Sequence, residues 1–231
     1  MRAGPLRLLD AGVVARLQES GYAARVTISH QRRRGDRAPR ISQPMTHYPY
    51  TIDNGQGETL TFTGISRGPE GERADVEGAA KPGAGPPMHV HYLQDEGVRV
   101  ISGRIGYQVL GGAPQFAGPG DMVVWPAGTA HKWWNAGDTE ARMTGWCSPP
   151  GNVEYYLDSV FASTRENGGR PGIFDAAFLM TRYRTEFAML ELPAFVRRVV
   201  MPLAYVLGRV LGKHAKYKNA PPPFTGGTAH R

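Results

Sequence analysis

The chain has 231 residues, 41% of them hydrophobic, which fits one domain with extensions and a packed core. Its formal net charge of +7 is unevenly distributed: residues 1–44 hold nine arginines against three acids, residues 45–181 hold nine basic against fifteen acidic residues, and residues 182–231 hold nine against two. The central region is therefore acidic, and the basic balance does not indicate a nucleic-acid partner. The single cysteine, Cys147, excludes an internal disulfide and favours a reducing, cytoplasmic setting.

Residues 1–44 form an arginine-rich, acid-poor leader, for which we expect disorder. The apolar run Ala11–Ala15 is too short for the core of a signal peptide, so we do not expect secretion. The leader resembles a transit sequence, but it also resembles translated upstream DNA with Met45 as the true start. Both interpretations remain open at this point.

The next segments alternate apolar and polar side chains, as half-buried strands do. Residues 59–65 predict a first strand, and a loop rich in glycine and proline follows at residues 82–87. The apolar runs Val98–Ile101 and Ile105–Leu110 predict two more strands, and Gly103 between them suits a tight hairpin with positive φ. Further strands are expected at Met122–Trp125 and Arg142–Trp146, and they end at Pro149-Pro150 because consecutive prolines cannot continue a strand ladder.

Within this region, two segments carry histidines at set spacings. The first reads G-x5-H-x-H-x4-E-x6-G and places His89, His91 and Glu96 between Gly83 and Gly103. The second reads G-x5-P-x-G-x2-H-x3-N and places His131 between Gly120 and Asn135.

The two segments resemble the first and second motifs of the cupin superfamily, in particular its small single-domain bacterial metal-binding members. The resemblance implies a mainly β fold: a cupin-type β-barrel, that is, a jelly-roll-like double-stranded β-helix, over residues 45–150. It also implies that His89, His91, Glu96 and His131 bind one divalent transition metal.

The chemistry of these four residues agrees with that implication. His89 and His91 are two residues apart, so both imidazoles face the same side of a strand. Glu96 breaks the alternation, and a turn or bulge at residues 93–95 would restore it. Imidazole and carboxylate ligands suit Fe, Mn, Ni, Cu or Zn, and the ligand types alone do not choose among them. An octahedral ion with four protein ligands keeps two positions for substrate or dioxygen.

The walls of the expected pocket are less well defined. By strand alternation Trp133 shares a face with His131, and Tyr107 lies on a neighbouring predicted strand, so both are candidate pocket residues. Between Gly85 and Cys147, no clear carboxylate besides Glu96 is expected to face inward. Sugar isomerisation needs a positioned acid and base, so this gap favours chemistry centred on the metal itself.

Beyond Pro150 the apolar period changes to 3.6, which predicts a C-terminal helical extension over residues 151–213. A short helix is expected around Val153–Phe161, and Asp175 could cap a second helix running to Leu190. The remaining residues, 214–231, are expected to form a flexible tail.

A third helix is predicted from Pro193 to about Lys213, with an apolar face and basic residues largely off that face. It is too short to span a bilayer. We favour packing of its apolar face on the barrel or on a second copy of the chain in a homodimer. Contact with a membrane surface is the less favoured alternative.

By the same resemblance, the leading functional interpretation is a dioxygenase-type oxidoreductase acting on a small organic substrate with an enol or phenol oxygen. Similarity to flavonol-cleaving cupins implies a catalytic role for Glu96, which would leave the metal to act as a base. The alternatives are a metal-dependent isomerase, cyclase or decarboxylase, and a non-catalytic small-molecule binding module.

We predict that deletion of residues 1–44 leaves the metal content and the thermal midpoint unchanged, because this segment has no strand pattern and few apolar anchors. Metal analysis and thermal melts of the full-length and truncated proteins would check this. A midpoint lowered by more than a few degrees would mean that the leader is docked to the domain.

Overall fold

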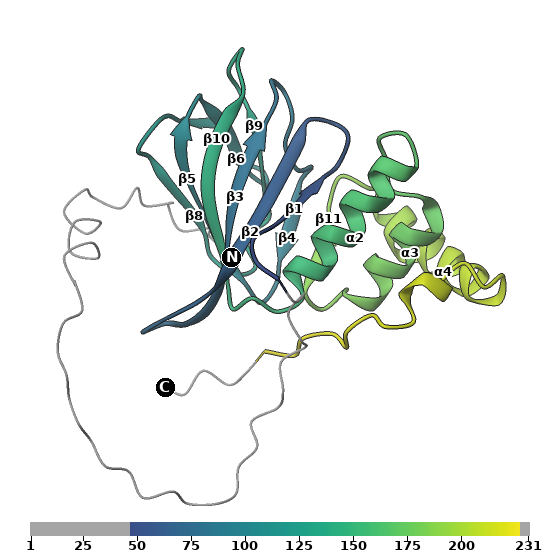
Figure 1. The fold of residues 1–231 in the computed structure, drawn as a ribbon. Helices are drawn as coiled ribbons and strands as arrows, with labels where there is room; N and C mark the ends of the chain where they lie inside the picture. The colour runs from purple at the N-terminus through teal and green to yellow at the C-terminus, as the bar shows by residue number, and fades with distance from the viewer. Residues whose placement is uncertain (1–46, 227–231) are drawn as a thin grey trace, which may run out of the picture. The chain divides into compact units, whose positions relative to one another are not determined.

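The computed structural model describes residues 47–226, and its fold is drawn in Figure 1. The expectations for residues 1–44, for Met45 as a start, and for the last five residues of the tail lie outside this range.

Two antiparallel sheets form the body of the domain, as Figure 1 shows. The first sheet has the order β1-β2-β3-β10-β5-β8, and its strands are β1 (Tyr50–Asp53), β2 (Glu58–Gly68), β3 (Gly71–Ala80), β5 (Asp95–Ser102), β8 (Met122–Trp125) and β10 (Ala141–Ser148). The second has the order β11-β4-β9-β6-β7, with strands β4 (His89–His91), β6 (Ile105–Val109), β7 (Gln115–Ala117), β9 (His131–Asn135) and β11 (Phe187–Met189). The expected mainly β, jelly-roll-like fold is confirmed, with two sheets in place of a closed barrel.

The core lies between the inner faces of the sheets, where strand alternation directs every second side chain inward. In β9, His131, Trp133 and Asn135 are buried, whereas the two residues between them are less buried. Val100 and Ile105 have no exposed surface and contribute to the same apolar cluster. The alternation expected around His131 is therefore confirmed.

Gly103 has the expected positive φ of 81°, but it does not close a hairpin. β5 pairs with β10 and β8 in the first sheet, whereas β6 pairs with β7 and β9 in the second. The turn at Gly103 carries the chain from one sheet to the other. Residues 92–94 also link the two sheets, from β4 to β5, so of the turn or bulge expected near this position the structure has a connection between strands.

The helical extension contains α2 (Val153–Glu166), α3 (Ile173–Arg182), the π-helical turn η1 (Val196–Val200), α4 (Met201–Val210) and the 3-10 turn η2 (Ala215–Tyr217). The second helix ends at Arg182 and does not reach Leu190 as expected. Asp175 also does not cap it, because its carboxylate accepts hydrogen bonds from Ser163 at 2.6 Å and Lys216 at 2.8 Å.

The chain after α3 instead forms β11, an edge strand that pairs with β4. In this register Phe187 lies opposite His91 and Met189 lies opposite His89. Backbone groups of β4 that would otherwise lie at a sheet edge are thereby paired. The extension therefore supports the strand that carries two of the predicted metal ligands.

Residues 218–226, expected as part of a flexible tail, return to the helices and form hydrogen bonds there. The carbonyl oxygen of Pro221 accepts a hydrogen bond from the Tyr183 hydroxyl at 3.0 Å. Glu186, which has no exposed surface, accepts hydrogen bonds from the Phe224 N–H at 2.8 Å and from the Asn152 side chain at 2.7 Å. This buried carboxylate joins the start of α2 to the returning chain.

None of the helices within residues 47–226 is both long enough and apolar enough to cross a membrane. α4 buries only Met201 and Gly208, and most of its apolar side chains do not cover the sheets.

We predict that Glu186→Ala lowers the free energy of unfolding by about 2–4 kcal/mol, because several buried donors lose their acceptor. Urea denaturation would measure this change. Glu140→Ala, which removes a surface carboxylate with 46% side-chain exposure, is the matched control and should change stability little. Equal stabilities of the two variants would contradict the role given to Glu186.

Candidate functional site

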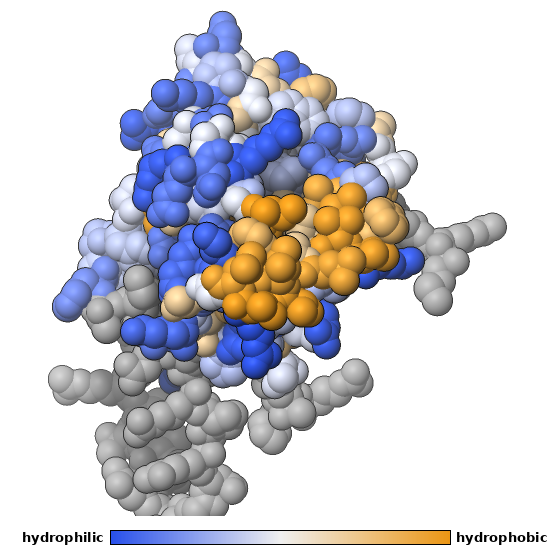
Figure 2. Space-filling model, turned by 90° about the vertical axis from the view of Figure 1, so that its right-hand side faces the viewer, coloured by the Kyte–Doolittle hydropathy of each residue, from blue (hydrophilic) through white to orange (hydrophobic). Residues whose placement is uncertain are grey.

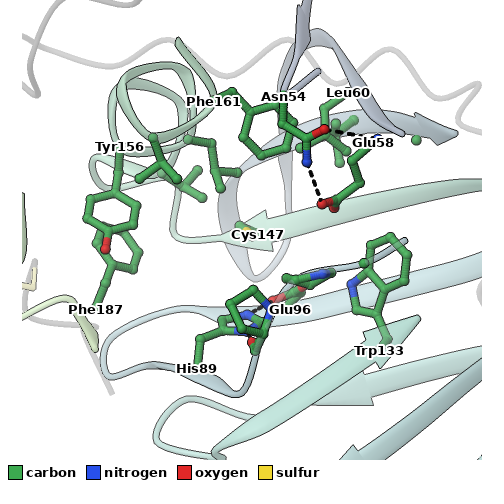
Figure 3. Close-up of a pocket in the computed structure, with 18 of the residues that line it drawn as sticks. Asn54, Glu58, Leu60, His89, Glu96, Trp133, Cys147, Tyr156, Phe161 and Phe187 are labelled. Atoms are coloured by element: carbon green, nitrogen blue, oxygen red, sulfur yellow. Dashed lines mark hydrogen bonds and ion pairs between the residues drawn. The ribbon is translucent and has the colours of Figure 1, made fainter. Parts of the chain in front are cut away.

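Three histidine side chains surround one carboxylate oxygen of Glu96, and these four residues come from three strands. Figure 3 shows this region. The Nε2 atoms of His91 and His131 each lie 3.2 Å from Oε2 of Glu96, and Nε2 of His89 lies 3.7 Å from it. Antiparallel pairing places His89 of β4 opposite His131 of β9, while Glu96 comes from the facing sheet. The structure therefore brings together all four residues predicted as metal ligands.

The ring orientation of two histidines follows from backbone contacts. Nδ1 of His89 lies 2.9 Å from the carbonyl oxygen of Pro87, and Nδ1 of His131 lies 2.9 Å from that of Thr129. A carbonyl oxygen only accepts hydrogen bonds, so each Nδ1 is the donor, and each Nε2 points toward Glu96, where it can bind a metal ion. The ring of Trp125 also stacks on that of His131, with centroids 4.2 Å apart and an angle of 6° between the planes.

Burial and the contacts between the histidines and Glu96 shift the pKa values of these residues. Burial lowers the pKa of His91 to about 3, so this ring is neutral near pH 7. Burial alone would raise the pKa of Glu96, but contacts with His131 and His89 outweigh it and hold the pKa well below its usual range. For His89, burial lowers the pKa, and the contact with Glu96 reverses this effect and raises it.

The residues fit a divalent metal ion. One ligand atom from each of His89, His91 and Glu96 can be chosen so that all three lie within 4.8 Å of one another. The ligand atoms are imidazole Nε2 nitrogens that face the Glu96 carboxylate and the ionised carboxylate itself, a set typical of transition-metal sites. Binding by these three residues together with His131, and the identity of the metal, remain predictions.

A cavity of about 480 Å³ opens beside this group. Its walls come from both sheets, from the 85–87 loop and from α2, and they are mainly apolar. They include Leu60, Phe62, Val76, Met143, Trp146, Tyr156, Phe161 and Phe187. Figure 3 shows α2 side chains on one side of the cavity and the metal-ligand candidates on another. His89, His91 and Glu96 all line the cavity, so a small molecule in it can reach the predicted metal.

Glu58 also lines this cavity, and the sequence prediction missed it. Its side chain is on β2, 6% exposed, and Oε2 accepts a hydrogen bond from Nδ2 of Asn54 at 3.1 Å. Burial raises its pKa to about 7, with the charge of His89 opposing the rise and that of Glu96 adding to it. A carboxyl group with such a pKa can both accept and donate a proton near neutral pH.

Between Gly85 and Cys147, Glu96 is the single acidic residue that lines the cavity, which agrees with the expectation, but the conclusion that the site lacks a second carboxylate is wrong. It considered only residues between Gly85 and Cys147, and Glu58 precedes that window. The signal was present in the alternation, because Glu58 is in phase with Leu60 and Phe62 on β2. An acid in phase with apolar side chains indicates a buried carboxyl group.

The two predicted pocket residues lie in different places. Trp133 lines the cavity, as Figure 3 shows. Tyr107 instead belongs to the hydrophobic core, 4% exposed, and its hydroxyl donates a hydrogen bond to Gln115 at 3.0 Å. Tyr107 is not among the residues that line the cavity, because β6 directs its ring toward Trp125.

Residues 78–147 match the family model of the cupin domain. A curated relative, the probable oxidoreductase virH of Hypocrea virens (strain Gv29-8 / FGSC 10586), is 30% identical over 80 residues, which cover 34% of this chain and 36% of the relative. The match thus spans about a third of that relative's length.

Two solved structures are also similar. A sugar phosphate isomerase of the cupin superfamily from Silicibacter pomeroyi DSS-3 has a TM-score of 0.38 and 21% identity, covering 43% of this chain and 71% of its own. KdgF from Halomonas sp. has a TM-score of 0.40 and 18% identity, covering 49% of this chain and 98% of its own.

We predict that His89→Ala, His91→Ala and His131→Ala each remove most of the bound metal and leave the domain folded, because side-chain packing holds the sheets. Glu96→Gln should retain more metal, since an amide oxygen still coordinates. Mass spectrometry of the metal and circular dichroism would test both points. His47→Ala, a change at an exposed histidine, is the control. Wild-type metal content in all three alanine variants would contradict the site.

We predict that Glu58→Gln stabilises the metal-free protein at pH 8 and has little effect at pH 5. The folded-state pKa of about 7 lies above the ordinary 4.5, so the folded protein loses stability as the pH rises from about 4.5 through 7. This difference in pKa corresponds to roughly 3 kcal/mol. Denaturant titrations at both pH values would measure it, and Glu140→Gln should show no such pH dependence. A Glu58→Gln effect that is equal at both pH values would refute the assignment.

Proposed function

Because this chain contains a cupin domain at residues 78–147, we propose that it is a metal-dependent oxidoreductase of the dioxygenase type. Its substrate would be a small, largely apolar organic molecule with an enol or phenol oxygen. The observation that carries the proposal is the convergence of three imidazole Nε2 atoms on the Glu96 carboxylate at the wall of an apolar cavity. The printed name of the relative from Hypocrea virens, an oxidoreductase, supports the reaction class.

The cavity walls support the substrate class. Most lining side chains are apolar, and burial of an apolar substrate against them is favourable. Among the lining residues, all within 47–226, Arg170 is the single arginine or lysine, whereas three carboxylates are present: Glu58, Glu96 and Glu191. A divalent cation at the predicted metal site, together with Arg170, would balance these carboxylates, so the mainly apolar walls, and not the charge, favour an apolar molecule over a sugar phosphate.

A bound redox-active ion would supply Lewis acidity toward the substrate oxygen and the capacity to react with dioxygen. The chain's own residues would hold and orient the substrate. Trp133 and Phe187 from the second sheet, and Leu60 from the first, would surround its apolar part and exclude water. His89, His91 and Glu96 border the space where its oxygen would lie.

Two carboxylates are candidates for proton transfer. Glu96 has a pKa well below its usual range, which makes it a weak base and a suitable ligand. Glu58, with a pKa of about 7, is better suited to accept the enol or phenol proton on its own carboxylate oxygen. The base role predicted for Glu96 thus remains an expectation, and Glu58 is the better-placed alternative.

Glu58 also favours a second candidate function: a metal-dependent isomerase, cyclase or decarboxylase, which needs a proton acceptor and uses no oxygen. A non-catalytic small-molecule binding module is the third candidate, since the cavity alone suffices for binding. The proposed homodimer and the cytoplasmic setting do not distinguish these functions.

Oxygen uptake separates the three functions. We expect Fe(II)-loaded protein to consume dioxygen in step with the loss of a small phenol or enol from a substrate panel, and Zn(II)-loaded protein to consume none, because zinc is redox-inert. Turnover without oxygen would establish the isomerase, cyclase or decarboxylase class. Saturable binding without turnover, under any metal, would establish the binding module.

We predict that Glu58→Gln lowers kcat by about 100-fold or more, since general acid–base groups contribute about 10²–10⁴. Glu96→Gln should be similarly severe, because the site loses both charge and basicity. Glu154→Gln is the matched control: it changes a buried carboxylate that binds Tyr48 and does not line the cavity. Steady-state kinetics on metal-matched samples would measure these effects. Unchanged kcat in Glu58→Gln would exclude its role as a proton carrier.

A further inference from the structure

A continuous apolar surface on the C-terminal helix has no partner within the described chain. We call it the α4 apolar face; its residues, with exposed fractions, are Phe195 67%, Val199 40%, Leu203 66%, Val206 59%, Leu207 51%, Val210 77% and Leu211 54%. Figure 2 shows a large hydrophobic patch on the side of the molecule that carries the helices. Soluble proteins rarely expose a contiguous apolar patch of this kind without a binding function.

The orientation of the helix is set by its opposite face, which packs on α3. Tyr205 stacks on Phe178 with ring centroids 6.2 Å apart. Gly208 is buried, and a Cβ there would lie 2.5 Å from Nε2 of His214, which itself contacts the carbonyl oxygen of Phe174 at 3.1 Å. Because one face is anchored so closely, the helix cannot turn its exposed face inward. Of the two alternatives expected for this face, packing on the sheets is therefore wrong, and packing on a second copy remains a prediction.

The charges beside the patch have one sign. From Leu192 to Lys218 the chain has six basic residues and no acidic residue. Arg198, Arg209 and Lys213 are exposed, and none of the ion pairs found within residues 47–226 involves them. Exposed leucines and valines beside such cations match the two layers of an anionic membrane surface, its acyl chains and its headgroups.

A second copy of the chain fits this surface less well. In a twofold dimer through the α4 apolar face, the same patch of each chain would meet its own copy. The cations of both copies would then lie close together, and the 192–218 segment contains no carboxylate to neutralise them. Anionic lipid supplies the missing negative charge.

We propose that the α4 apolar face is a docking surface for an anionic lipid bilayer. The helix lies in the interface without crossing it, with the leucine and valine side chains among the acyl chains and Arg198, Arg209 and Lys213 at the headgroups. This proposal is independent of the reaction at the metal site, since α4 contributes no residue to the cavity.

Sedimentation with vesicles tests the proposal on the full-length protein. Vesicles of phosphatidylcholine with about a third phosphatidylglycerol should bind the protein with at least tenfold higher affinity than pure phosphatidylcholine vesicles, as measured by its loss from the supernatant. Salt at 0.5 M should release most of it, because a shorter Debye length weakens the headgroup contacts. Equal depletion by both vesicle types, or none by either, would overturn the proposal.

Two pairs of variants locate the contact. Leu203→Ser/Val210→Ser should abolish vesicle binding, whereas Leu110→Ser, which changes a leucine with 60% exposure in the turn after β6, should not. Arg198→Gln/Arg209→Gln should weaken binding at least fivefold, whereas Arg67→Gln, far from α4 in sequence, should not. Circular dichroism would verify that each variant is folded.

The rival occupant predicts a different result. If a second copy covers the face, sedimentation velocity will show a dimer of the wild-type protein that Leu203→Ser/Val210→Ser converts to a monomer, with no vesicle binding by either. That outcome would overturn the lipid assignment.

Discussion

The approach of three imidazoles to the Glu96 carboxylate is the interaction on which the site depends. It joins the two sheets, because Glu96 lies on β5 of one and the histidines lie on β4 and β9 of the other. An ionised carboxylate buried at this depth requires compensating partners, and His131 and His89 supply them. The carbonyl oxygens of Pro87 and Thr129 orient the two rings. The loops beside the strands are therefore part of the site.

The C-terminal extension completes the site from a distance in sequence. β11 pairs with β4 behind His89 and His91, and α2 supplies one wall of the cavity. Glu186, just before β11, binds Asn152 at the start of α2 and Phe224 of the returning chain. The extension thus supports β4, which carries His89 and His91. Through α2 it also shapes the cavity in which a substrate would lie.

Two carboxylates in one cavity have different protonation properties because their surroundings differ. Glu96 is surrounded by imidazoles that stabilise its charge, whereas Glu58 lies among apolar side chains with Asn54 as its hydrogen-bond donor. The first is therefore suited to bind a cation and the second to carry a proton. This division of roles suits both oxygen-dependent and oxygen-independent chemistry, since either reaction can use a group that accepts the substrate proton.

The sequence alone predicted parts of β2, β5, β6, β8 and β10 and the four residues that meet at the site, because local spacing and alternation decide which side chains share a face. The jelly-roll-like fold followed from the resemblance of the two histidine segments to cupin motifs, and β1, β3 and β7 were not predicted. The sequence did not reveal Glu58 as a cavity residue, the location of Tyr107 in the core, or the pairing of β11 with β4. Those features depend on contacts between segments far apart in the chain, which periodicity does not encode. The exposure of the α4 apolar face was likewise decided by tertiary structure, since the pattern is the same whether protein or lipid covers it.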